Sequence, residues 1–133
     1  MDSSIRMVED FVRVIARVLF FREMKQFVNA MSELDNLNKS ITGFNLSQIK
    51  ALGIDGLTNY FDMNNYSDIE KIYYSAKTMK EEAIVNFERG KSDDGFQSLA
   101  FALGMFELVK KHDSKKEIAG LDEEINIIRS RIN

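Results

Sequence analysis

The feature that most constrains this chain is the complete absence of proline from its 133 residues. Proline ends or kinks helices, so a chain without it can form long, uninterrupted ones. Apolar residues recur every three or four positions along most of the sequence, which is the spacing of one helix face. No segment alternates apolar and polar residues between turn signals, as a half-buried strand would. The sequence therefore predicts an all-α fold.

The apolar periodicity predicts an antiparallel array of about five to six helices in a single domain, residues 1–133. The expected segments are a hairpin at 4–41, an irregular middle at 42–66, a second hairpin at 67–112 and a final helix at 115–132. The middle is expected to be irregular because Gly53 and Gly56 interrupt it. Short helices are still expected within it, at residues 46–52 and 57–61.

Capping residues predict several helix ends. Gly43 follows the second helix, where a glycine in the left-handed conformation commonly ends a helix. Ser67 with Glu70, and Ser114 with Glu117, have the spacing of a capping box. In that motif the serine oxygen accepts from a backbone N–H and the acid reaches back to another. Helices are therefore expected to begin at both serines, with Leu121 as the alternative start of the final helix because Gly120 lies inside it.

The first helix is apolar around most of its circumference. One face, expected to point inward, comprises Ile5, Val8, Val12, Ile15 and Leu19. Further apolar residues widen this arc, namely Met7, Phe11, Val14, Val18 and Phe20. A terminal helix with one neighbour does not need so wide an arc, so the final helix, a second chain or a membrane surface should cover it. The helix at 92–112 is apolar on all sides and is expected in the middle of the bundle.

Small residues occupy positions where the two helices of each hairpin are expected to cross. The first hairpin has Ala30, Leu34 and Leu37, and the second has Gly95, Leu99 and Ala102. This pattern resembles the tetratricopeptide repeat, in which a small residue is followed four positions later by a large apolar one. The two small residues are about 65 positions apart, close to two repeat periods. The resemblance implies a short tetratricopeptide-like array with a degenerate middle unit, although the closing proline of the repeat is absent.

The segment 7–20, MVEDFVRVIARVLF, resembles the start of a family of small helical proteins of unknown function from Gram-positive bacteria. That resemblance implies a bacterial, cytoplasmic setting and brings no known activity. Asp2, Glu9 and Asp10 stand where a signal peptide would need a basic segment and an apolar run. No apolar stretch is long enough to predict a transmembrane segment.

The residue types that most catalytic and cofactor sites need are missing. The chain has no cysteine and one histidine, His112, which suits a cation at a helix C-terminus. Acidic pairs at 81–82, 93–94 and 123–124 point about 100° apart on a helix, so they do not converge on a metal ion. No phosphate-binding loop or metal motif occurs. We therefore expect no metal, cofactor or enzymatic activity, and the net charge of -3 argues against nucleic acid as a partner.

All four tyrosines of the chain fall between residues 60 and 74. Tyrosine combines an apolar ring with a polar tip and is enriched at protein interfaces. The candidate partner-binding residues are therefore Tyr60, Phe61, Tyr66, Tyr73 and Tyr74. The alternative is a half-exposed lid over the core, which amphipathic rings also suit.

The final helix carries an apolar stripe of the kind that pairs helices. Its members, spaced 3, 4, 3 and 4 residues apart, are Ile118, Leu121, Ile125, Ile128 and Ile132. Acidic residues lie near the start of this helix and arginines near its end. If two copies paired in opposite directions, the acids of one would face the arginines of the other. The last four of these residues are therefore candidates for self-association as a homodimer. The alternative is that the helix docks within its own chain.

Taken together, these features favour a non-enzymatic protein-interaction or scaffolding module, because no catalytic chemistry is visible in the sequence. The partner is expected to be a protein or peptide, which the sequence does not identify. The alternative is a sensor that binds a peptide or small ligand in a helical groove near the tyrosines.

Overall fold

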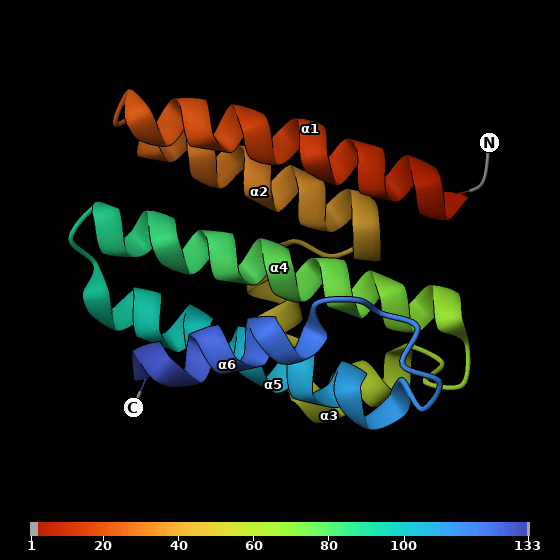
Figure 1. The fold of residues 1–133 in the computed structure, drawn as a ribbon. Coiled ribbons are helices and arrows are strands. Elements are labelled where there is room, and N and C mark those ends of the chain that lie inside the picture. The colour runs from red at the N-terminus through yellow and green to blue at the C-terminus, as the bar shows by residue number, and fades with distance from the viewer. Residues whose placement is uncertain (1–2, 133) are drawn as a thin grey trace.

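The computed structural model describes residues 3–132, which form six α-helices (Figure 1). The helices are α1 (Ser3–Glu23), α2 (Phe27–Thr42), α3 (Leu46–Tyr60), α4 (Tyr66–Glu88), α5 (Ser92–His112) and α6 (Leu121–Ile132). No residue in the described range lies in a β-strand, which confirms the all-α prediction.

The helices are arranged around α4, which lies between the α1–α2 hairpin and the group of α3, α5 and α6 (Figure 1). On one side α4 packs mainly against α2 and, over a smaller area, against α1. On the other side it packs along the length of α5, which in turn contacts α6 and α3. Helices α1, α2, α4, α5 and α6 therefore follow one another in space as they do in the chain, whereas α3 lies beside α5.

The most central helix is α4, although its sequence is less apolar than that of α5. The prediction placed the helix at 92–112 in the middle, and α5 is indeed covered by three neighbours. However, α4 separates the two halves of the molecule. Its buried positions include Ser75, Thr78, Glu82 and Asn86, which lower its hydropathy. None of the buried side-chain polar atoms within residues 3–132 lacks a hydrogen-bond partner, so these groups are accommodated without an unpaired donor or acceptor.

The inward face of α1 differs from the predicted one. Phe11, Val14 and Val18 are buried, whereas Val12 of the expected face is 62% exposed. The ring of Phe11 meets that of Tyr74 on α4, with the centroids 5.2 Å apart. Helix α1 has two adjacent apolar faces. The face that contains Phe11, Val14 and Val18, and not the predicted one, packs on α2 and α4.

The predicted hairpin crossings are buried. Ala30 and Leu34 of α2 are fully buried, as are Leu99 and Ala102 of α5 to within 2%. At Gly95 a Cβ atom would lie 2.7 Å from the ring of a phenylalanine on α4, so only glycine fits without a shift. The small residue therefore permits the close approach of α4 and α5 that the sequence pattern predicted.

The segment between the hairpins is more regular than expected. Helix α3 includes the first predicted short helix and all of the second except Phe61, which is the C-cap, and Gly53 kinks it between them with a φ of 72° and ψ of 171°. Asn45 caps the helix in a full capping box with Gln48. The positive φ explains why a glycine stands at the kink, since other residues rarely adopt it.

Both serine capping boxes predicted from the sequence are wrong. Asn65, and not Ser67, caps α4, because its side chain accepts from the backbone N–H of Asp68. The final helix begins at Leu121, the alternative start that Gly120 indicated, and not near residue 115. Residues 113–120 form a connecting loop in which the Asp113 carboxylate accepts from two backbone N–H groups. This acceptor stabilises a turn where a helix was expected.

Candidate functional site

The five predicted partner-binding residues separate into two groups. Tyr60 and Phe61 lie at the end of α3, where the Tyr60 ring meets that of Phe44 with centroids 4.7 Å apart. Tyr66, Tyr73 and Tyr74 lie on α4. Tyr60 and Phe61 do not line the pocket that the three tyrosines of α4 share.

The α4 group lines an open pocket of about 270 Å³, which we call the tyrosine pocket. Its wall comprises Tyr66, Glu70, Tyr73, Tyr74 and Lys77 from α4 with Glu117, Ile118 and Ala119 from the loop 113–120. Tyr73 is buried, and its hydroxyl donates to the carbonyl of Ala119 at 3.3 Å. This bond ties the floor of the pocket to the loop that forms its opposite wall.

Lys77 lies among aromatic rings at this pocket. Its Nζ atom is 5.1 Å from the ring centroid of Phe11, 5.5 Å from that of Tyr73 and 5.6 Å from that of Tyr74. Each ring face attracts a cation at such a distance. The ammonium group is therefore held over the rings, and the pocket combines aromatic, basic and acidic groups.

The tyrosine hydroxyls of the pocket remain protonated at neutral pH. Burial raises the pKa of Tyr73 to about 12, and the carboxylate of Glu124 adds to the effect. Burial also raises the pKa of Tyr74 and of Tyr66, with a further contribution from Glu70 in each case. A neutral phenol can donate or accept a hydrogen bond, which suits binding of polar groups.

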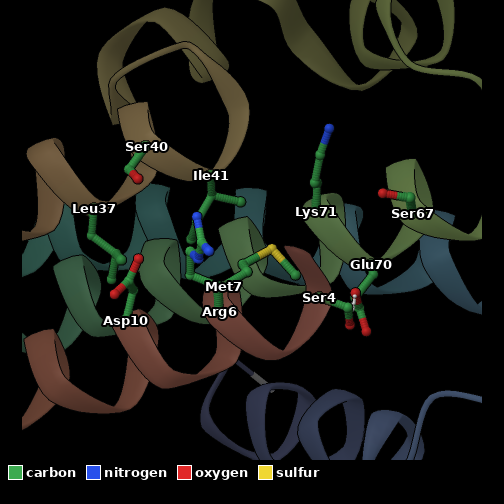
Figure 2. Close-up of a pocket in the computed structure, with 10 residues that line it drawn as sticks. All are labelled: Ser4, Arg6, Met7, Asp10, Leu37, Ser40, Ile41, Ser67, Glu70 and Lys71. Carbon is green, nitrogen blue, oxygen red and sulfur yellow. Dashed lines mark hydrogen bonds between the residues drawn. The ribbon is translucent and has the colours of Figure 1, made fainter. Parts of the chain in front are cut away.

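A second pocket, of about 220 Å³, opens where α1, α2 and α4 meet (Figure 2). Its charged residues are Arg6, Asp10, Glu70 and Lys71, two of each sign. Ser4 donates to Glu70 at 2.6 Å, and Figure 2 shows these two side chains together at one end. Because Glu70 lines both pockets, it lies between the two openings.

The stripe on the final helix is packed inside its own chain. Leu121, Ile125 and Ile128 are buried, and α6 packs on α5, whereas Ile132 is 39% exposed. An ion pair between Lys80 of α4 and Glu124 also holds α6 to the rest of the molecule. This is the intramolecular docking that the sequence left open, and it removes most of the stripe from contact with a second chain.

A buried polar cluster links three helices and had no signal in the sequence. Lys50 of α3 donates to the carboxylate of Glu82 on α4 and to the hydroxyl of Ser98 on α5. Ser98 donates to the same carboxylate at 2.7 Å. Ser98 is fully buried and Glu82 is 5% exposed, so neither lies at an opening where a substrate would meet it. We assign this cluster to the fixing of α3 and not to catalysis.

Within residues 3–132, no three histidine, cysteine or acidic side chains are grouped as they would be around a metal ion. No helix in the same range has the length and apolar character needed to cross a bilayer.

Comparisons with known proteins identify no relative of this chain. No protein-family model, curated protein or solved structure matches it. The resemblances described above therefore rest on the residues that carry them.

Proposed function

We propose that this chain is a non-enzymatic protein-interaction module that binds a protein or peptide at the tyrosine pocket. The observation that carries this proposal is the convergence of Tyr66, Tyr73, Tyr74 and Lys77 on one open pocket. Tyrosine supplies a large contact area and loses little side-chain entropy when it is held in place. A partner is therefore expected to insert an apolar or aromatic side chain against these rings.

The charges at the pocket favour a particular kind of partner residue. Glu70 and Glu117 line the pocket, and Lys77 is already engaged with the rings. A basic group on the partner would pair with the two carboxylates and would be repelled less than an acidic one. We therefore propose a partner segment that carries an aromatic or aliphatic residue next to a lysine or arginine.

The test uses immobilised protein to recover partners from the cytoplasm of a Gram-positive host. The variant Tyr66→Ala with Lys77→Ala alters the pocket, and Tyr60→Ala removes an even more exposed tyrosine outside it. A true partner should be retained by the wild type and by Tyr60→Ala and lost by the double variant. Equal retention by all three proteins would refute binding at this pocket.

The second candidate function is a sensor of a peptide or small ligand. The pocket in Figure 2 favours it, because Arg6 and Lys71 could bind a carboxylate while Asp10 and Glu70 bind an amine. A shift in unfolding temperature with free amino acids, absent in the Arg6→Ala variant, would support this function. No shift with any zwitterion would exclude this ligand class.

We further propose a tetratricopeptide-like architecture and a bacterial, cytoplasmic setting. The hairpins α1–α2 and α4–α5, with small residues at their crossings, support the architecture, and α3 takes the place of a degenerate unit. The setting rests on the family resemblance of segment 7–20. We also propose that the chain forms a homodimer, as the sequence suggested, through a surface other than the buried α6 stripe.

A further inference from the structure

Helix α1 carries an apolar stripe that its own chain leaves uncovered. The stripe consists of Ile5, Val8, Val12, Ile15 and Leu19, spaced 3, 4, 3 and 4 residues apart. Val8 and Ile15 are half-buried, whereas Ile5, Val12 and Leu19 are 52%, 62% and 46% exposed. The contacts of α1 with the core use mainly the adjacent face, formed by Met7, Phe11, Val14, Val18 and Phe21, and Ile15 of the stripe also packs against the core. Ile5, Val12 and Leu19 thus form the exposed part of the stripe, with the spacing of a helix-pairing seam.

We propose that this α1 stripe joins two copies of the chain in an antiparallel, two-fold dimer. The inference rests on the homodimer proposed above and names its surface. A 3-4 spacing keeps apolar residues facing a second helix. In a two-fold dimer the same patch meets itself, so it must be self-complementary. With the axis at Val12, Ile5 of one copy lies level with Leu19 of the other, and each end of the stripe is covered by apolar surface.

The charges beside the stripe agree with this orientation. Glu9 and Arg13 lie one helical turn apart on the outer flank of α1, and both are exposed. In a dimer whose two-fold axis passes through Val12, Glu9 of one copy lies close in height to Arg13 of the other. Because the helix rises about 1.5 Å per residue, the two residues are separated by only about 3 Å along the helix direction. Symmetry repeats the match, for which Arg13 would exchange its ion pair with Asp10 of its own helix, at 3.0 Å, for one with Glu9 of the other copy.

The fold also removes the usual obstacle to pairing so short a helix. Two isolated heptads are marginal because the helix must form as it associates. Here α2 and α4 already hold α1 in place, so association does not have to order it. A membrane surface is the competing occupant. Interfacial helices favour lysine and arginine on the polar face, and α1 carries four arginines together with three acids, Glu9, Asp10 and Glu23.

The first test is sedimentation of the wild type, Val12→Asp and the matched control Val28→Asp. Val28 is 79% exposed on α2 and lies outside the stripe. The wild type and the control should be dimers. Val12→Asp should weaken the dimer by ~100-fold or more, because it buries two unpaired carboxylates at the axis. A monomeric wild type, or a Val12→Asp variant that stays dimeric with unchanged circular dichroism, overturns the proposal.

The second test uses single cysteines in a chain that has none. Val12→Cys should form disulfide-linked dimers on mild oxidation, and Ile5→Cys should link to Leu19→Cys but not to itself. Self-linkage of Ile5→Cys would overturn the antiparallel orientation. A monomeric wild type that sediments with anionic phospholipid vesicles would also overturn the dimer and assign the stripe to lipid. Failure of the dimer proposal would not count against partner binding at the tyrosine pocket, because the variant Tyr66→Ala with Lys77→Ala tests that binding in a separate experiment.

Discussion

Replacement of Lys50 by methionine should destabilise the whole fold, although Lys50 lies on the inserted helix α3. Its ammonium group neutralises the buried carboxylate of Glu82 and donates to Ser98. Glu82 keeps 7% of its side chain exposed and Lys50 keeps 28%. Methionine preserves most of the apolar stem of Lys50, so the substitution removes the charge while it changes packing little. The buried carboxylate then loses its counter-charge.

The magnitude follows from how deeply the pair is buried. Removal of one member of a buried ion pair costs about 3–5 kcal/mol, because the other charge is left uncompensated. Water reaches the partly exposed Lys50 and reduces that cost. We therefore expect Lys50→Met to lower the free energy of unfolding by about 2–3 kcal/mol. In a domain of this size the unfolding midpoint would fall by roughly 6–12 °C.

The assay is urea unfolding followed by circular dichroism, with the slope against denaturant checked for constancy. The matched control is the double variant Lys50→Met with Glu82→Met, which removes both charges. It should recover to within about 1 kcal/mol of the wild type, since apolar residues often replace a buried pair without loss. A loss below about 0.5 kcal/mol in the single variant, or a double variant as unstable as the sum of the singles, would refute the reasoning.

Three further outcomes are expected. Gly95→Leu should cost roughly 1–3 kcal/mol of unfolding free energy, more than Gly56→Ala, because it overpacks the α4–α5 crossing; equal melting temperatures would contradict this. A hydrogen bond from an arginine lowers the pKa of Glu88, so Glu88→Gln should destabilise the fold at pH 7. Burial raises the pKa of Glu81, so Glu81→Gln should stabilise the fold at pH 7. Both effects on the unfolding midpoint should fade as the pH falls below about 4. The raised pKa of Tyr73, about 12, predicts stability that is lost as the pH rises above about 10; Tyr73→Phe should reduce that loss in urea unfolding at high pH.

Local signals in the sequence were sufficient for the hairpin crossings. Ala30 and Gly95 were assigned to crossings because small residues let two helices approach, and both are buried. The stop at Gly43 was also predicted correctly, and its φ of 87° is left-handed. These features depend on neighbours within one or two helical turns, which a sequence pattern contains.

Features that depend on distant parts of the chain were not predictable in the same way. The cluster of Lys50, Glu82 and Ser98 joins three helices, and no spacing rule relates those positions. The serine boxes failed for a related reason. Asn65, two residues before Ser67, provides the acceptor for the first turn of α4. A search for capping patterns does not decide between two neighbouring residues that can both cap a helix.

The candidate binding residues were partly grouped by the structure. Tyr66, Tyr73 and Tyr74 share a pocket because they lie on one helix within about two turns. Tyr60 and Phe61 end the preceding helix, and the turn that follows separates them from that pocket. The opposite wall of the pocket, from loop 113–120, could not be foreseen, since that segment was expected to be helical.

The stripes on α1 and α6 have the same spacing and opposite fates, and chain connectivity explains the difference. The loop 113–120 lets α6 fold back on α5, so docking costs little more than loop closure. In contrast, α1 is joined to α2 by a tight turn in which Lys25 has a φ of 57°. That turn directs the Phe11 face of α1 toward α2 and α4, and the adjacent stripe is then directed outward. Ile5, Val12 and Leu19 of the stripe therefore stay exposed in the described residues, and the proposed dimer would cover them.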